Sequence, residues 1–329
     1  MDDMTMDQVK QDLQNTYEQV KTAVGWTVDK RILLSIASYY VTTGKTFNGK
    51  EFLATSDAIK QKSGWFSPLR SHIHYMMAAF LQKNNEDSSL AVEKLIEKYD
   101  ILKSVGFKSN VYSYLAALLM TNDDSTQQSI EAAQAKHLYD EMKSHHPFLT
   151  QPDDVPYAVM LGKLPGEPKE RALTMNRYYT ELRTHGFYMG NELQWMSQIL
   201  TFKSPTYHAN MVAQTVQIRD QLKSAKIKIK SMHYVMVGFL AVLDIKEEAL
   251  EHVIGTYREL ETMKLFSWYK EMILSLAVQL ETKHIIDNDC ITSVSFATTI
   301  EMMMQAQQAA MVATMAATSA AVASSSGES

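Results

Sequence analysis

The stretch YYTELRTHGF (residues 178–187) has the form of the last turns of a helix followed by the residues that end it. Three similar stretches are YDILKSVGF (99–107), YDEMKSHHPF (139–148) and YRELETMKLF (257–266). The position of the key tyrosine recurs every 38 to 43 residues, at Tyr17, Ser56, Tyr99, Tyr139, Tyr179, Arg219 and Tyr257. A recurring period of this length indicates a helical-repeat protein.

Two further columns predict how each copy ends. The third residue after the tyrosine position is always apolar: Val20, Ile59, Leu102, Met142, Leu182, Leu222 and Leu260. Eight or nine residues after it stands a large apolar residue: Trp26, Trp65, Phe107, Phe148, Phe187, Ile227 and Phe266. Glycine precedes that residue in four copies: Gly25, Gly64, Gly106 and Gly186. A left-handed glycine followed by an apolar residue that folds back is a common helix ending. We therefore expect each copy to end in a buried apolar plug.

A second helix is predicted between successive copies. Small residues stand inside apolar runs there: LLSIASYY (33–40), YMMAAFL (75–81), YLAALLM (114–120), YAVMLG (157–162), WMSQIL (195–200), VMVGFLA (235–241) and ILSLAVQ (273–279). Small side chains allow helix axes to approach closely. Capping residues and prolines predict helix starts at Ser67 with Pro68, at Asp153 or Asp154 before Pro156, and at Pro168.

The predicted fold is all-α: a right-handed solenoid of about seven helix–turn–helix repeats of about 40 residues, similar to tetratricopeptide and pentatricopeptide superhelices. No linker rich in Pro, Gly or Ser divides the repeats, so residues 1–298 are expected to form a single helical-repeat domain. Residues 299–329 are rich in Met, Ala and Ser, and we expect a helix there that frays into a disordered tail.

Composition narrows the possible environments of the chain. Its 329 residues carry a formal net charge of −5, which disfavours nucleic acid as a partner. Cys290 is the single cysteine, so an internal disulfide is impossible. The acidic, polar start MDDMTMDQVKQDL is unlike a signal peptide, and no stretch of 18 uninterrupted apolar residues is present. We expect a cytoplasmic protein without a transmembrane segment.

Charged residues form two further columns. The fourth residue after the tyrosine position is basic in six copies: Lys21, Lys60, Lys103, Lys143, Arg183 and Lys223. The residue directly after the tyrosine position is acidic in five copies: Glu18, Asp57, Asp100, Asp140 and Asp220. In the seventh copy both signs reverse, to Arg258 and Glu261. Opposite charges three residues apart favour surface ion pairs of about 0.2–0.5 kcal/mol each over a basic ladder that binds an acidic ligand or RNA.

Residues with possible chemistry are sparse. His72 and His74 are two residues apart, so on a helix they face different directions. His145 and His185 occupy one repeat position near a helix end, where a cation suits the helix dipole. A metal site in SHH (144–146) and an anion site in SAKIKIKSMH (224–233) are weaker interpretations than solvated turns. No HExxH, P-loop, GxSxG or GxGxxG motif is present. We predict no catalytic, cofactor-binding or metal-ligating residue and no cofactor.

Several segments resemble a known family. They are ILLSIASYYVTTGKTF (32–47), FLATSDAIKQKSGWFSPLRSHIHYMMAAFL (52–81), VYSYLAALL (111–119), FLTQPDDVPYAVMLG (148–162), GFYMGNELQWMSQIL (186–200) and the tail from QAQQAAM to SSS (305–326). They resemble the domain-of-unknown-function family 4003. This resemblance implies a bacterial, cytoplasmic, helical protein, and it carries over no activity, ligand or functional residue.

Stacked helical repeats commonly present an extended concave surface to a partner. The sequence therefore predicts a scaffold that binds a protein or peptide on that surface, by analogy of fold, and leans away from an enzyme. Two alternatives stay open: an enzyme on a closed ring of helical hairpins with carboxylates around a pocket, and a pentatricopeptide-like RNA binder. The sequence does not indicate the partner, the oligomeric state or a small-molecule pocket.

Overall fold

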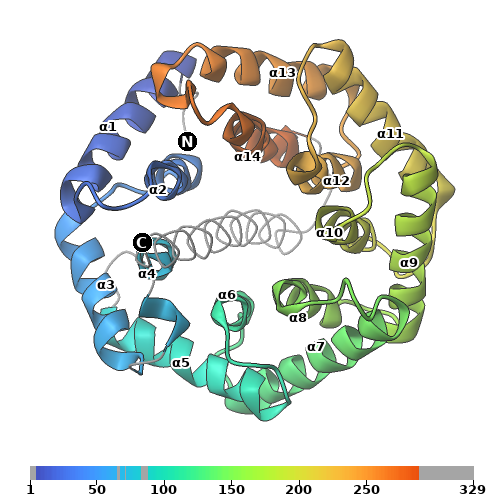
Figure 1. Cartoon of the computed structure of the whole chain (residues 1–329), viewed down its shortest axis with the longest axis horizontal. Coiled ribbons are helices and arrows are strands. Elements are labelled where there is room, and N and C mark those ends of the chain that lie inside the picture. Colours follow the sequence, from blue (N-terminus) through green and yellow to red (C-terminus); the bar gives the residue numbers. More distant parts are fainter. Residues whose placement is uncertain (1–4, 65–66, 71, 83–87, 289–329) are drawn as a thin grey trace, which may run out of the picture. The chain divides into compact units, whose positions relative to one another are not determined.

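The computed structural model describes residues 5–64, 67–70, 72–82 and 88–288. Within them the chain forms fourteen α-helices and short 3₁₀ turns, and no strand, which confirms the all-α prediction (Figure 1). The α-helices are α1 (Met6–Val24), α2 (Lys30–Thr43), α3 (Gly49–Lys62), α4 (Ile73–Leu81), α5 (Ser88–Ser104), α6 (Val111–Leu119), α7 (Ser125–His145), α8 (Val155–Gly162), α9 (Pro168–Thr184), α10 (Asn191–Ile199), α11 (Ala209–Ser224), α12 (Tyr234–Val242), α13 (Glu247–Glu261) and α14 (Ile273–Asn288). The 3₁₀ turns are η1 (Pro68–Arg70), η2 (Pro152–Asp154), η3 (Ser231–His233), η4 (Lys264–Phe266) and η5 (Lys270–Met272). Trp65, Cys290 and the segment 299–329 lie outside the described residues.

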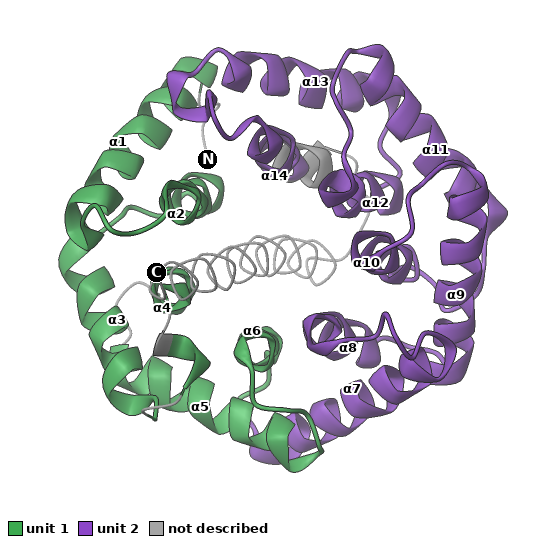
Figure 2. Cartoon of the chain, viewed as in Figure 1, with its two compact units in different colours: residues 1–123, 304–329 green, residues 124–303 purple. Residues whose placement is uncertain are grey.

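The described residues divide into two compact units, unit 1 up to residue 123 and unit 2 from residue 124 to residue 288 (Figure 2). In unit 1, α1 packs on α2, α3 on α4 and α5 on α6; in unit 2, α7 packs on α8, α9 on α10, α11 on α12 and α13 on α14. We call each such pair a hairpin. In unit 1 neighbouring hairpins meet through α1–α3, α3–α5, α2–α4 and α4–α6; in unit 2 they meet through α7–α9, α9–α11, α8–α10, α10–α12 and α12–α14. First helices thus lie on first helices and second helices on second helices within each unit.

The apolar column that begins at Val20 is buried in every copy, as predicted. Its members come from the first helix of each hairpin. The apolar runs of the predicted second helices lie in α2, α4, α6, α8, α10, α12 and α14, and they are largely buried. Burial of these two sets of side chains is the main favourable contribution to the fold. No described helix combines the length and apolar character needed to cross a bilayer.

Small residues allow close helix contacts, as expected. A Cβ atom added to Gly162 of α8 would lie 2.9 Å from the backbone nitrogen of Ala135 in α7. A Cβ atom added to Gly238 of α12 would lie 2.9 Å from Cγ of Met196 in α10. Gly162 therefore lets α8 approach α7 of its own hairpin, and Gly238 lets α12 approach α10 of the neighbouring hairpin.

The endings of α5 and α9 follow the predicted glycine pattern. Gly106 has φ 103°, and Phe107 donates its backbone N–H to the carbonyl oxygen of Leu102 at 3.2 Å. Gly186 has φ 82°, and Phe187 donates in the same way to Leu182 at 3.2 Å. In both cases the N–H group bonds to the carbonyl oxygen five residues before it. This 6→1 hydrogen bond is typical of the Schellman motif, which satisfies carbonyl groups that the helix leaves free.

Two other helices make the same ending without glycine. Lys226 follows α11 with φ 65°, and Ile227 then donates to the carbonyl oxygen of Leu222 at 3.0 Å. Asp244 follows α12 with φ 54°. A left-handed residue therefore ends these helices even where the residue is not glycine, so glycine alone does not identify every such ending. The left-handed prediction is wrong at Gly64, whose φ is not positive.

The plug column is confirmed at Phe107, Phe187, Ile227 and Phe266, which are buried. It is wrong at Trp26 and Phe148, which are 90% and 89% exposed. After α1, Gly25 is extended in ψ (179°) and directs the chain outward, so that Val28 is buried instead. After α7, His146 has φ −131° and no left-handed residue follows, so that Thr150 is buried in place of Phe148.

In two copies the recurring tyrosine is hydrogen-bonded to the turn inside its own hairpin. The hydroxyl of Tyr179 accepts the backbone N–H of Gly190 at 3.2 Å, just before α10 begins. The hydroxyl of Tyr99 is hydrogen-bonded to Oγ of Ser109 at 2.5 Å, just before α6 begins. In these two copies the residue that marks the repeat in the sequence therefore holds the connection between the first and second helix.

The predicted helix starts are partly confirmed. Pro168 is the first residue of α9. Oγ of Ser67 accepts the backbone N–H of Leu69 at 3.3 Å, but the turn that follows Ser67 is the 3₁₀ turn η1 and α4 begins later, at Ile73.

Candidate functional site

A buried carboxyl group stands where the α7–α8 connection of unit 2 meets α10. Asp154 ends η2 and is 1% exposed. The sequence predicted Asp153 or Asp154 as the cap before Pro156, and Asp154 does stand at the N-cap position of α8, although its side chain makes no capping bond to that helix. Its Oδ2 instead accepts the backbone N–H of Gln151 at 2.8 Å, which leaves the carboxyl facing α10.

Two glutamines of α10 meet this carboxyl group. Gln198 donates from Nε2 to Oδ1 of Asp154 at 2.6 Å, and Gln194 donates from Nε2 to Oδ2 at 3.2 Å. Gln194 also donates to Oγ1 of Thr150 at 3.2 Å. Residues 191, 194 and 198 fall on one face of α10 because an α-helix repeats every 3.6 residues. This face connects the second helix of one hairpin to the turn of the preceding hairpin.

Asp153 lies beside this contact and completes the group. Asn191, the first residue of α10, donates from Nδ2 to Oδ2 of Asp153 at 3.2 Å. We call Thr150, Asp153, Asp154, Asn191, Gln194 and Gln198 the Asp154 cluster. Its partners come from two hairpins about 40 residues apart, so the cluster fixes how these hairpins meet.

The electrostatics of the cluster favour a neutral Asp154. Burial raises the pKa of Asp154 to about 7, and the charge of Asp153 adds to this rise. The donors Gln151, Gln198 and Gln194 lower the pKa, but they do not offset the cost of burying a charge. Burial also raises the pKa of Asp153. A carboxylic acid that titrates near neutral pH is chemically suited to proton transfer.

A small cavity lies next to the cluster. It is lined by Met142, His146, Ala172, Met175, Tyr179, Gln194, Ser197 and Gln198. Its volume of ≈ 10 Å³ is about that of one water molecule. The cavity is therefore too small for an organic substrate, and Asp154 itself does not line it.

Unpartnered polar atoms gather around α10. In the part of the chain that the structure describes, five buried atoms here make no hydrogen bond: His146 Nε2, Asp153 Oδ1, Gln194 Oε1, Trp195 Nε1 and Gln198 Oε1. Each such atom costs free energy, of the order of 1–3 kcal/mol, when no partner replaces the water it has lost. The set contains acceptors and a donor, on neutral and acidic side chains.

His233 occupies the place in the α11–α12 connection that Asp154 has in the α7–α8 connection. Its Nδ1 accepts the backbone N–H of Lys230 at 3.1 Å, and its Nε2 lies 3.0 Å from the carbonyl oxygen of Glu271 in the next hairpin. Burial lowers the pKa of His233, which favours the neutral imidazole. The sequence analysis did not identify Asp154 or His233 as residues that join two hairpins. The available signal was a polar residue directly before the second helix in both copies.

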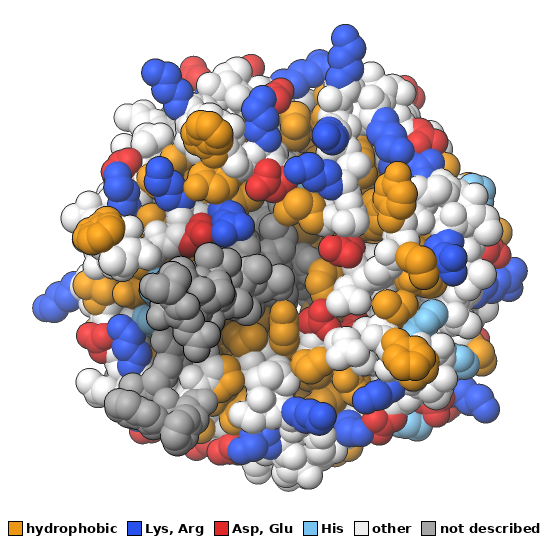
Figure 3. All heavy atoms as spheres, viewed as in Figure 1, with side chains coloured by type: hydrophobic (Ala, Val, Ile, Leu, Met, Phe, Trp, Pro, Cys, Tyr) orange, Lys and Arg blue, Asp and Glu red, His pale blue; other side chains and the backbone are white. Residues whose placement is uncertain are grey.

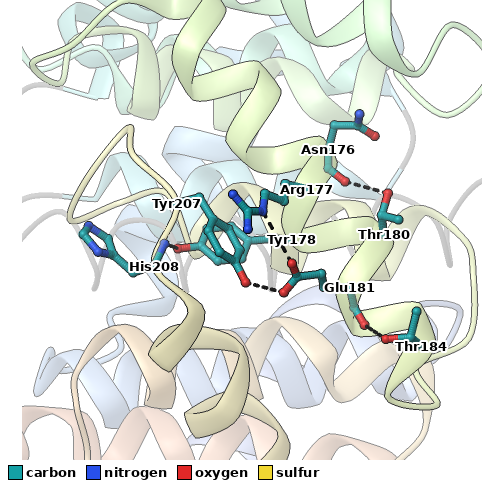
Figure 4. A network of polar contacts seen from close by, with 8 residues as sticks. All are labelled: Asn176, Arg177, Tyr178, Thr180, Glu181, Thr184, Tyr207 and His208. Atoms are coloured by element: carbon teal, nitrogen blue, oxygen red, sulfur yellow. Dashed lines mark hydrogen bonds and ion pairs between the residues drawn. The ribbon is translucent and has the colours of Figure 1, made fainter.

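A second polar network joins α9 to the α10–α11 connection (Figure 4). The hydroxyl of Tyr207 donates to Glu181, and the guanidinium of Arg177 lies 3.6 Å from the centre of the Tyr207 ring. The hydroxyl of Tyr178 accepts the backbone N–H of His208 at 3.0 Å. These contacts hold a connecting loop on the surface of α9, and we assign them a structural role.

The predicted ion-pair column is confirmed in three copies and wrong in three. The confirmed pairs are Glu18–Lys21 at 3.2 Å, Asp57–Lys60 at 3.5 Å and Asp100–Lys103 at 3.6 Å. Elsewhere the acid takes another partner: Asp140 pairs with Lys136, Asp220 with Arg219 and Glu261 with Lys270. Exposed charges exchange partners at little cost, because each pair contributes about 0–1 kcal/mol.

The other residues considered from the sequence do not converge. His72 stacks with Tyr75, whereas His74 is buried. Lys226, Lys228 and Lys230 are exposed around the end of α11. Among the described residues, no three His, Cys, Asp or Glu side chains are grouped so that they could hold a metal ion.

Comparison with known proteins agrees with the resemblance seen in the sequence. The family model described as "Protein of unknown function (DUF4003)" matches residues 16–309. The chain is 30% identical over 298 residues to "Uncharacterized protein YeaA" of Bacillus subtilis (strain 168), which covers 89% of this chain and 90% of that protein. No solved structure matches the chain.

Proposed function

This chain belongs to the DUF4003 family of proteins of unknown function, and we propose that it is a helical-repeat scaffold that binds a peptide or a segment of another protein. In this proposal residues 1–298 form one domain, a right-handed solenoid of about seven hairpins. The packing of first helices on first helices and second helices on second helices within each unit supports it, because stacked repeats pack in this way. We also propose a cytoplasmic location, where a chain needs no disulfide.

Two unpartnered polar atoms on half-buried residues, Asp153 Oδ1 and Trp195 Nε1, are the observation that carries the proposal. A peptide backbone offers an N–H donor and a C=O acceptor at almost every residue. The acceptor Asp153 Oδ1 and the donor Trp195 Nε1, which belong to half-buried residues, are complementary to that pattern, whereas Gln194 and Gln198 are buried. A bound segment would provide the partners that Asp153 Oδ1 and Trp195 Nε1 lack in the described chain.

The half-buried residues of α10 mark where such a segment would lie. Asn191, Glu192 and Trp195 are half-buried, whereas the other residues of α10 are buried. The ring of Trp195 is stacked on Tyr157 of α8, with 6.2 Å between ring centroids and 17° between planes. An aromatic side chain with one polar atom is typical of binding surfaces, because it combines apolar contact with a directed hydrogen bond.

Affinity capture from the native cytoplasm, with mass spectrometry of the retained proteins, tests this proposal. The informative variant is Trp195→Phe, which removes the indole N–H and keeps an aromatic ring against Tyr157. We expect this variant to bind the partner with about tenfold lower affinity, which is the effect of losing one buried hydrogen bond. The matched control is Trp268→Phe, at a residue that is 87% exposed and far along the chain. Equal capture by wild type and Trp195→Phe, or no specific partner, would contradict the proposal.

The pKa of Asp154 supports a second candidate, acid–base catalysis at the Asp154 cluster. A buried carboxylic acid with a pKa of about 7 can both donate and accept a proton near neutral pH. Mass spectrometry of small molecules retained by the native protein distinguishes the two candidates. A small molecule that is retained by wild type and lost from Asp154→Asn favours the enzyme; a retained peptide or protein that is indifferent to Asp154→Asn favours the scaffold.

A further inference from the structure

The connections between first and second helices in unit 2 expose large apolar side chains. Phe148, between α7 and α8, is 89% exposed. Tyr188 and Met189, between α9 and α10, are 79% and 67% exposed, and Trp268, between α13 and α14, is 87% exposed. Side chains this exposed are in contact with almost nothing in the chain, and burying them elsewhere would be favourable by about 1.5–3 kcal/mol for each fully covered ring.

Hydrogen bonds link these connections one to the next. Asn191 bonds Asp153 at 3.2 Å, which joins the α9–α10 connection to the α7–α8 connection. The backbone N–H of Tyr188 donates to the hydroxyl of Tyr234 at 3.1 Å, which joins it to α12. Nε2 of His233, at the start of α12, lies 3.0 Å from the carbonyl oxygen of Glu271, which joins the α13–α14 connection. The four connections therefore form one continuous edge of unit 2.

We call residues 146–154, 185–190, 225–233 and 262–272 the turn edge. Besides the exposed aromatic residues it carries exposed lysines: Lys226, Lys228, Lys230, Lys264 and Lys270. Its acidic residues Asp153 and Glu271 are half-buried and Asp154 is buried. On the face drawn in Figure 3, hydrophobic side chains lie interspersed with charged side chains of both signs.

We propose that the turn edge binds the surface of an anionic lipid bilayer. Trp and Tyr side chains are favoured at the boundary between lipid headgroups and acyl chains, because each combines an apolar ring with one polar group. A Phe side chain adds apolar contact with the acyl chains. Lysines beside them are attracted to anionic headgroups by about 1 kcal/mol each, or about a fivefold gain in affinity. Aromatic residues and lysines on one edge are the two signals that together give stable attachment without a membrane-spanning helix.

The shape of the edge favours a bilayer over a peptide. Peptide and small-molecule sites are concave and cover most of their ligand. Phe148, Tyr188 and Trp268 instead project from three separate turns and are almost fully exposed. A bilayer surface can receive several projecting side chains at once, without a groove. In unit 1, taken by itself, Trp26 is likewise 90% exposed in the connection between α1 and α2.

Vesicle sedimentation with the full-length protein tests the proposal. Vesicles of phosphatidylcholine alone and of phosphatidylcholine mixed equally with phosphatidylglycerol are the two probes. We expect sedimentation with the anionic vesicles, weakening as salt is raised because the charges become screened. The variant Phe148→Ser, Tyr188→Ser, Trp268→Ser should lose at least about tenfold in affinity, since three exposed rings no longer enter the interface. The double variant Lys228→Gln, Lys230→Gln should lose about fivefold for each lysine, on anionic vesicles only.

The matched control is Ile130→Ser with Leu173→Ser. These residues are 45% and 47% exposed on the helices α7 and α9, outside the turn edge, and their replacement should leave vesicle binding unchanged. Absence of sedimentation with anionic vesicles at low salt overturns the proposal, as does equal binding by the triple serine variant. Binding to polyuridylate or polyglutamate without binding to vesicles also overturns it, and would assign the lysines to an acidic polymer. None of the substituted residues lies on α10, so the outcome is independent of the proposed scaffold function.

Discussion

Phe187 and Leu182 are joined by a backbone hydrogen bond of 3.2 Å that closes the end of α9. The buried ring of Phe187 then lies edge to face against Tyr234 of the next hairpin, with 4.9 Å between ring centroids. The guanidinium of Arg219, from the first helix of that hairpin, lies 4.6 Å from the centre of the same ring. One residue therefore ends its own helix and contacts both helices of the neighbouring hairpin.

Replacing Phe187 with Ala should lower the free energy of unfolding by about 3–5 kcal/mol, because it leaves a cavity between two hairpins. Phe148→Ala is the matched control: Phe148 occupies the same sequence column but is 89% exposed, and its loss should change stability by less than about 0.5 kcal/mol. Urea denaturation measures both. Similar losses for the two variants would contradict the assignment of Phe187 as the buried plug.

Replacing Lys226 with Gly should raise the free energy of unfolding by about 1 kcal/mol. Lys226 adopts φ 65° at the end of α11, and a residue with a Cβ atom is strained there by roughly 1–2 kcal/mol, partly offset by the greater freedom of glycine in the unfolded chain. The control is Lys228→Gly, in the following segment, where φ is not positive and glycine should give no gain. Thermal denaturation of both variants distinguishes relief of strain from loss of a charge.

Asp154 should make stability depend on pH. Its folded-state pKa of about 7 lies above the value of about 3.9 for an unfolded Asp. Between about pH 4 and pH 7 the folded chain holds a proton that the unfolded chain has released, so this contribution to stability decreases as pH rises through that window. Asp154→Asn stays neutral at every pH. The free energy of unfolding of this variant, taken relative to that of wild type, should therefore rise by about 3 kcal/mol as the pH is raised from 5 to 8.

The control for this pH dependence is Asp220→Asn. Hydrogen bonding to Arg219 lowers the pKa of Asp220, so that this group is charged in both states over the range tested. Its difference from wild type should therefore be constant between pH 5 and pH 8. A constant difference for Asp154→Asn as well would mean that Asp154 is ionised in the folded protein.

The sequence predicts what depends on local periodicity and fails where distant partners decide. The column from Val20 to Leu260 is correctly predicted as buried. An apolar residue that recurs at the same helical position in each repeat indicates the side of the helix that faces the core. Trp26 and Phe148 are wrong because a single backbone angle before each of them turns the side chain outward. The role of Asp154 could not be predicted, because its partners Gln194 and Gln198 lie 40 and 44 residues away and belong to another hairpin.

The proposed peptide scaffold is tested most directly by the indole N–H of Trp195. In a ¹⁵N–¹H NMR spectrum of the native protein each tryptophan gives one indole signal, and the signal that disappears in Trp195→Phe belongs to Trp195. On addition of the captured partner, our proposal predicts that this signal shifts, because Nε1 gains the hydrogen-bond partner that it lacks among the described residues. The signal of the exposed Trp268 should stay in place. A Trp195 signal that does not move while the partner is bound would contradict the proposal that α10 is the binding surface.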